Sequence, residues 1–295
     1  MKLATYSDGS RDGQLVVVSR DLAQAHYAGG IAGRLQTALD DWNFYAPQLQ
    51  ALAGQLDAGR ARHAFAFDPA RCLAPLPRAY QRLEGVQTGD APHVIQRPSD
   101  TLLAARDPIE AAAQTEGPDL GAGLAVITGD VPRGATPEQG QDAIRLITLA
   151  NVFHLRASAQ GDVQIGAALG PVAVTPDELG AAWQGGRARL ILSVTVNGRK
   201  LGLIETGEMR WPFGALIAHA ARWCALTTGC IVGSGVIGHA GGARGFASLA
   251  GKRAAELAQE GAAYTPWLCA GDSVRIEMKG ADGASVFGAI EQTAV

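Results

Sequence analysis

The chain has 295 residues, 47% of them hydrophobic, and its 25 basic and 28 acidic residues give a formal net charge of −3. This length and apolar content suffice for one large or two modest soluble domains with a substantial core. The charges are interspersed without a basic stripe, so we expect no nucleic-acid partner. Because there is neither an apolar run of about 18 residues nor a secretory pattern, we expect no membrane contact and a cytoplasmic protein.

The N-terminal part is expected to form a hairpin followed by a helix. An apolar run at 2–6 meets a polar turn, and a second apolar run follows at 14–19. Large apolar residues then recur three, four and seven positions apart, as in an amphipathic helix: Leu35, Leu39, Trp42, Leu49, Leu52 and Leu56. Pro47 is expected to kink or split this helix. Residues 1–75 are therefore predicted to form a small α+β domain.

A turn-rich stretch follows, marked by Pro69, Pro75, Pro77, Pro92 and Pro98. We predict a linker at 76–98 and a larger domain at 99–295. Within the linker, the run from Pro92 to Gln96 has the pattern of an apolar strand.

The larger part is dominated by predicted strands. Residues 188–197 and 199–204 alternate well enough to form a hairpin around Asn197-Gly198, and 273–279 pairs with 285–290 through a turn at Asp282-Gly283. Three segments have helical patterns: a start at Thr175-Pro176-Asp177-Glu178, which combines a hydroxyl N-cap with a first-turn proline and glutamate, and runs at 212–223 and 248–259.

The run from Thr265 to Met278, which reads TPWLCAGDSVRIEM, resembles the closing signature of the fumarylacetoacetate hydrolase superfamily. Other segments match that family in order and spacing: Ser99-Asp100, Arg106-Asp107-Pro108-Ile109, Ala125–Thr128, Val172–Leu179, Leu216–Ala220 and Gly233-Ser234-Gly235. The resemblance implies an α+β fold: a β-rich, mixed-sheet roll with flanking helices, preceded by a small N-terminal α+β domain. It also implies a homodimer.

Members of this family use a divalent cation, commonly magnesium, manganese or calcium, to polarise a β-diketo acid for carbon–carbon cleavage. The resemblance places the family's Glu-x-Glu pair at Gly121 and Gly123, and its further aspartate at Val152. The family's lysine falls at Gln164, and a late-helix glutamate falls at Gly251. Glycine and valine offer no oxygen ligand from their side chains. We therefore expect no family-type metal site and no cofactor.

Candidate catalytic residues are histidines that could replace the family's general base: His154, His93 and His239. The alternative for His154 is a polar residue on an exposed loop.

Candidate substrate-binding residues are Arg106, Asn151, Gln164 and Ser234. Arg106 could clamp a substrate carboxylate or pair with the adjacent Asp107, whereas Gly233-Ser234-Gly235 could simply serve tight backbone turning.

Three functions stay open. The first is a non-hydrolytic or pseudoenzyme member that binds a small β-dicarbonyl or enol acid, or an active paralogue. The second is a metal-independent tautomerase, cyclase or retro-Claisen hydrolase, because enolisation between two carbonyls needs only a base and hydrogen-bond donors. The third is a hydrolase whose metal site is rebuilt from Asp119, Glu116 and Asp162.

Overall fold

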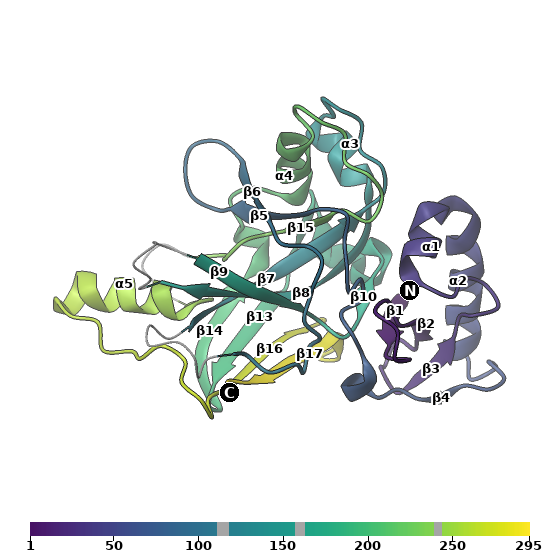
Figure 1. The fold of residues 1–295 in the computed structure, drawn as a ribbon, viewed down its shortest axis with the longest axis horizontal. Helices are drawn as coiled ribbons and strands as arrows, with labels where there is room; N and C mark the ends of the chain where they lie inside the picture. The colour runs from purple at the N-terminus through teal and green to yellow at the C-terminus, as the bar shows by residue number, and fades with distance from the viewer. Residues whose placement is uncertain (111–117, 157–162, 239–243) are drawn as a thin grey trace.

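The computed structural model describes residues 1–110, 118–156, 163–238 and 244–295 (Figure 1). It has the mixed α+β, strand-rich architecture that the sequence predicts, with two main sheets and a few helices around them. Within the described residues, no helix is long and apolar enough to cross a membrane.

The large sheet runs in the order β4-β3-β2-β1-β10-β8-β7-β15-β5-β6, and β9 pairs with β8. It is mixed, because β15 lies parallel to β5 and antiparallel to β7. Its strands are β1 (Lys2–Tyr6), β2 (Gln14–Val18), β3 (Gln24–Tyr27), β4 (Phe65–Ala66), β5 (Arg82–Val86), β6 (His93–Arg97), β7 (Pro118–Thr128), β8 (Ile144–Leu155), β9 (Val163–Leu169), β10 (Ala173–Val174) and β15 (Ile231–Gly233).

A second sheet, in the order β14-β13-β16-β17, packs against the large one near β7 and β8. Its strands are β13 (Ile191–Val196), β14 (Arg199–Glu205), β16 (Ser273–Lys279) and β17 (Ser285–Thr293); a short pair, β11 (Trp183–Gln184) and β12 (Arg187–Ala188), stands apart. The two hairpins predicted in the larger part are confirmed. Asn197 and Gly198 have φ of 51° and 70°, as a two-residue turn between twisted strands requires.

The helices are α1 (Leu35–Asp40), α2 (Trp42–Asp57), α3 (Pro137–Asp142), α4 (Phe213–Ala220) and α5 (Leu249–Glu260), with 3-10 turns η1 (Pro69–Arg71), η2 (Pro176–Ala182) and η3 (Thr206–Glu208). The first helical segment breaks at Asp41, between α1 and α2, whereas Pro47 lies inside α2, so the expectation that Pro47 splits the helix is wrong. The predicted helix starting at Thr175 is the 3-10 turn η2, and Thr175 makes no side-chain cap there.

Two strands, β5 and β6, lie in the range expected to be a linker, and β5 joins the large sheet beside β15. The N-terminal strands join the same sheet, because β1 pairs with β10 through Lys2 and Val174 and through Leu3 and Ala173. The division into 1–75, 76–98 and 99–295 stays a prediction.

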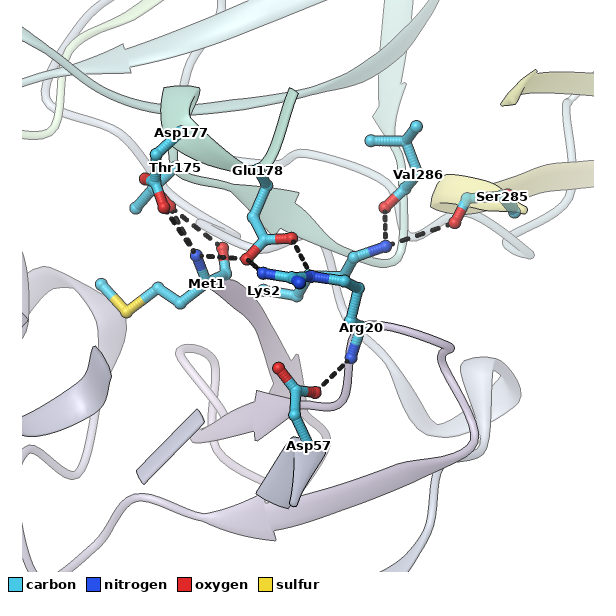
Figure 2. Close-up of polar contacts among 9 residues, drawn as sticks. All are labelled: Met1, Lys2, Arg20, Asp57, Thr175, Asp177, Glu178, Ser285 and Val286. Carbon is cyan, nitrogen blue, oxygen red and sulfur yellow. Dashed lines mark hydrogen bonds and ion pairs between the residues drawn. The ribbon is translucent and has the colours of Figure 1, made fainter. Parts of the chain in front are cut away.

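The chain's first residues are tied to the larger part by buried polar contacts (Figure 2). The Met1 ammonium donates to Thr175 Oγ1 at 2.6 Å and lies 2.9 Å from Glu178 Oε1. Arg20 Nε lies 3.1 Å from the other oxygen of Glu178. Lys2 Nζ donates to the carbonyl of Val286 in β17 at 2.7 Å. These contacts link β1, η2 and β17 and supply partners for charges that would otherwise be costly to bury.

Both faces of β7 are covered. Leu120, Leu124 and Val126 belong to the core cluster that includes the second sheet, whereas Ala125 and Ile127 belong to the cluster under the N-terminal helices. Successive side chains of a strand point to opposite faces, so Gly121 and Gly123 share the face of Ala125 and Ile127. Every residue of β7 is buried.

Candidate functional site

The positions that the family resemblance assigns to metal ligands lie together on the central strands. Gly121 on β7 faces Val152 on β8, and Gly123 faces Ala150. The chain then returns in β15, so that Ser234 N donates to the carbonyl of Leu124 at 2.7 Å. The resemblance therefore places the expected positions in one buried region, formed by β7, β8 and the end of β15.

Side chains and backbone fill the space in front of both glycines. A Cβ added at Gly121 would lie 2.7 Å from Val152 Cγ2 and 2.9 Å from Val236 Cγ2. A Cβ added at Gly123 would lie 2.6 Å from Ser234 Oγ and 2.8 Å from the carbonyl oxygen of Gly235. Atoms cannot approach this closely without a shift, so a longer side chain could not enter this region of the present fold.

Ser234, a candidate substrate-binding residue, is fully buried. Its Oγ accepts from the amide of Leu124 at 3.0 Å and donates to the carbonyl of Gly235 at 2.7 Å. Gly235 has φ of 72° and passes close to Gly85, where a side chain would collide with the backbone. Tight backbone turning therefore accounts for this segment, and the serine hydroxyl is already satisfied.

A buried ion pair lies beside the same segment. Arg82 Nη2 and Glu84 Oε2 on β5 are 2.8 Å apart, and their side chains are only 4% and 10% exposed. The other oxygen of Glu84 accepts from the amide of Gly235 at 2.9 Å. This pair was not among the candidates predicted from the sequence. The available signal was Arg82-Leu83-Glu84, two opposite charges two residues apart in a short strand, which places both on one face.

Asn151, another candidate, is fully buried and structural. Its Oδ1 accepts from the amide of Gly121 at 3.3 Å, and its Nδ2 donates to Gln292 Oε1 at 3.2 Å. Gln292 in turn donates to the carbonyl of Asp107 at 2.7 Å. These bonds connect the two sheets and engage both the oxygen and the nitrogen of the Asn151 side-chain amide.

His154 lies in β8 and is 5% exposed. The alternative prediction, that it is a polar residue on an exposed loop, is therefore wrong. It faces Asp119 across the ladder with β7 and Gln164 across the ladder with β9. Gln164 donates to the carbonyl of Gly166 at 3.2 Å. Directly opposed residues have Cβ atoms about 4.5–5.5 Å apart, so His154 and Asp119 are neighbours.

Asp119 has a buried carboxylate that accepts hydrogen bonds from the first amides of α5. Its Oδ1 accepts from the amides of Leu249 and Ala250 at 2.8 and 3.2 Å, and its Oδ2 lies 3.0 Å from Arg156 Nε. Burial raises the pKa of the Asp119 carboxyl above its ordinary value, against the opposing effect of Arg156 and the two amides. A carboxylate at a helix N-terminus stabilises the helix.

His93 and His154 are not brought together. His93 is exposed on β6 at the sheet edge, and its ring centroid lies 6.0 Å from that of His219 on α4. Burial, followed by the nearby Arg222 and His93, lowers the pKa of His219. Four strand steps separate β6 from β8, which corresponds to roughly 19 Å. The third candidate, His239, lies outside the described residues.

Arg106 forms an ion pair with a different partner from the one expected. Its Nη2 lies 2.8 Å from Glu291 Oε2 on β17, and the Arg106 side chain is 44% exposed. Asp107, the expected partner, accepts from the amide of Ala104 at 2.7 Å. Arg106 therefore joins the start of the larger part to its last strand.

Within residues 1–110, 118–156, 163–238 and 244–295, no group of three or more His, Cys, Asp or Glu side chains is placed to hold a metal ion. A cavity of about 480 Å³ lies elsewhere, between the β13–β14 hairpin, α5 and residues 265–272.

Two family models match the sequence. The model described as fumarylacetoacetase N-terminal domain 2 matches residues 1–78, and the model described as fumarylacetoacetate (FAA) hydrolase C-terminal matches residues 74–295. A search of the curated proteins finds no match.

Several solved structures share the fold over the whole chain. Maleylpyruvate hydrolase from Sphingobium sp. SYK-6, in complex with manganese(II) ion and pyruvate, is 17% identical with a TM-score of 0.71, covering 100% of this chain and 99% of that one. A probable 2-hydroxyhepta-2,4-diene-1,7-dioate isomerase from Mycobacterium abscessus is 16% identical, with a TM-score of 0.70 and coverage of 100% and 98%. Fumarylacetoacetate hydrolase from Exiguobacterium antarcticum is 16% identical, with a TM-score of 0.68 and coverage of 100% and 99%. At these identities the likeness concerns the fold alone.

Proposed function

The chain belongs to the fumarylacetoacetate hydrolase family, and from this starting point we propose that it is a member without the family's metal-dependent carbon–carbon hydrolase site. Its role is then non-hydrolytic: it binds a small β-dicarbonyl or enol acid, or pairs with an active paralogue. The observation that carries the proposal is the filled space in front of Gly121 and Gly123.

The residues present do not fit a divalent cation such as magnesium or manganese. Such ions prefer several oxygen ligands, usually including carboxylates. Gly121, Gly123 and Val152 provide none from their side chains, and Val236 adds a further apolar side chain against Gly121. The carboxylate of Glu84, which lies against the segment after β15, already accepts from Arg82 and the amide of Gly235. A guanidinium thus supplies the positive charge that this buried carboxylate needs.

Manganese binding tests the proposal. We expect electron paramagnetic resonance of free Mn²⁺ to stay undiminished on adding the protein, so that no dissociation constant below about 1 mM is measurable. Turnover of a β-diketo acid should be absent with or without added Mg²⁺. A micromolar dissociation constant, together with an anomalous peak within ligand distance of residues 121 and 123 in soaked crystals, would contradict the proposal.

A metal-independent enzyme is the second candidate, and the neighbouring positions of His154 and Asp119 favour it. A buried histidine next to a carboxylate is an arrangement that can act as a general base. This candidate predicts turnover of a β-diketo acid that resists chelator and disappears in His154→Gln. Unchanged turnover in His154→Gln, His93→Gln and His239→Gln would remove it.

A rebuilt metal site is the least supported alternative. Both oxygens of Asp119 already accept hydrogen bonds from α5 and Arg156. The other two proposed ligands, Glu116 and Asp162, lie outside the described residues.

The assembly state also belongs to the proposal. We expect a homodimer by family likeness, which sedimentation velocity would test. Co-purification with an intact relative would instead favour the paralogue-binding role.

A further inference from the structure

The cavity of about 480 Å³ next to the β13–β14 hairpin combines cationic and apolar walls. One wall is the hairpin itself, with Arg199 and Lys200 just after the turn. Another is the first turns of α5, with Leu249 and Lys252, and the third is the 265–272 segment, with Trp267. The volume falls in the range of roughly 300–1,000 Å³ that is typical of small-molecule sites.

Two carboxylates at this cavity are already hydrogen-bonded: Asp272, which lines it, and Glu256, which bonds the lining residue Thr265. Asp272 accepts from Asn197 Nδ2 at 2.7 Å and from the amide of Cys269 at 2.8 Å. Glu256 accepts from the amides of Tyr264 and Thr265 at 2.8 and 2.9 Å. Both carboxylates therefore hold the cavity's walls in place.

The cationic side chains that line the cavity have fewer partners than these carboxylates. Over the part of the chain that the structure describes, the side chain of neither Arg199 nor Lys200 forms an ion pair or hydrogen bond, although both backbones pair with β13. Lys252 Nζ is 3.9 Å from Glu256 Oε1, a long contact between partly exposed side chains. Both hairpin cations are exposed, so their heads can turn toward a bound anion.

The apolar wall has a fixed geometry. Arg253 on α5 places its guanidinium 4.5 Å from the centroid of the Trp267 ring, and it also donates to the carbonyl of Thr265. Trp267 is half-buried against the core, and Leu249 and Leu268 are buried beside it. A stacked cation restricts the indole, and a restricted apolar surface loses little entropy on binding.

We propose that this cavity binds a small organic anion, with the anionic head at the cationic rim formed by Arg199, Lys200 and Lys252 and the apolar body against Trp267. The chemical class is a carboxylate attached to a flat or aliphatic apolar group. Charge-assisted hydrogen bonds from this cationic rim supply orientation, and burial of the apolar body supplies affinity. The inference goes beyond the proposed loss of the metal site and does not depend on it, because no lining residue belongs to β7, β8 or β15.

Isothermal titration calorimetry with three probes tests the site in the full chain. The probes are 1-naphthoate, the uncharged 1-naphthamide and acetate, which lacks the apolar body. We expect naphthoate to bind with a dissociation constant below about 1 mM, and the other two to bind at least about tenfold more weakly. Equal binding of naphthoate and naphthamide, or no saturation by naphthoate, would overturn the proposal.

A charge-matched pair of variants locates the binding. Arg199→Gln/Lys200→Gln removes two of the three cations that line the cavity, whereas Arg133→Gln/Lys279→Gln removes the same charge from exposed positions outside the cavity. All four side chains are exposed, so both variants should fold, which urea denaturation checks. We expect the cavity variant to weaken naphthoate binding about tenfold and the control to leave it within about twofold. Equal effects of the two variants would refute the assignment of this cavity.

Discussion

Replacing Gly123 by alanine tests whether the space beside β7 is filled. The new Cβ would lie 2.6 Å from Ser234 Oγ and 2.8 Å from the carbonyl oxygen of Gly235. The hydroxyl could rotate away, but Ser234 would then lose its bonds to the amide of Leu124 and the carbonyl of Gly235. The carbonyl of Gly235 could move only with the backbone after β15.

The expected cost follows from these two contacts. Overpacking a dense core costs about 1–3 kcal/mol, and a broken buried hydrogen bond adds about 1 kcal/mol. We therefore expect Gly123→Ala to lower the free energy of unfolding by roughly 2–4 kcal/mol. Urea denaturation followed by circular dichroism measures this value, and an unchanged slope with denaturant would show that the unfolded state is unaffected.

Gly166→Ala is the matched control. Gly166 also lies in a strand, β9, but its added Cβ would make ordinary contacts at 3.4 Å to Phe153 and 4.0 Å to Leu103. Its stability should stay within about 1 kcal/mol of wild type. Adding Ser234→Ala to Gly123→Ala should recover part of the loss, because the Oγ contact disappears. If Gly123→Ala is as stable as Gly166→Ala, a ligand side chain could enter the region and the argument for a filled site fails.

Three further predictions concern buried charge. Arg82→Met should destabilise the fold by about 3–5 kcal/mol, because the buried Glu84 carboxylate loses its counter-ion. In urea denaturation, Arg82→Met/Glu84→Met should recover most of that loss. An Arg82→Met variant as stable as wild type would contradict the buried pairing. For Glu178, burial acts to raise the pKa, but Arg20 and the chain's ammonium outweigh it and lower the pKa below the ordinary 4.5. The contribution of the Glu178 carboxylate to stability is therefore present above about pH 4.5 and is lost as the pH falls through the lowered folded pKa. The unfolding free energy of Glu178→Gln should therefore decline less steeply than that of wild type as the pH is lowered. Parallel declines of the two proteins would refute this. Asp119→Asn should destabilise the fold by about 1–2 kcal/mol and speed hydrogen exchange of the amides of Leu249 and Ala250, with unchanged exchange as the contrary result.

Local signals in the sequence identified much of the secondary structure. Asn197-Gly198 has the backbone angles that its residue types favour, and Ser248 caps α5 by accepting from the amide of Gly251. The resemblance to the family correctly indicated the sheet-rich architecture. These features depend on neighbouring residues or on motifs spread along the whole chain.

Features that depend on long-range contacts were not predictable in this way. Thr175 has the sequence pattern of a helix cap, but the Met1 ammonium, 174 residues away, engages its hydroxyl. His154 lies near the end of β8 and is paired on one side with β7 and on the other with β9, so it is buried in the sheet rather than exposed on a loop. Likewise, nothing near Arg82 in the sequence indicates that Glu84 would bond the amide of Gly235, 151 residues later.

The junction between β1 and β10 bears on how the molecule melts. Two residue pairs continue the backbone ladder from the N-terminal strands into the larger part, and Lys2 reinforces it by reaching the carbonyls of Ser285 and Val286. Loosening either portion exposes hydrogen-bonding groups of the other. Heating should therefore give a single calorimetric endotherm, with both portions losing structure cooperatively.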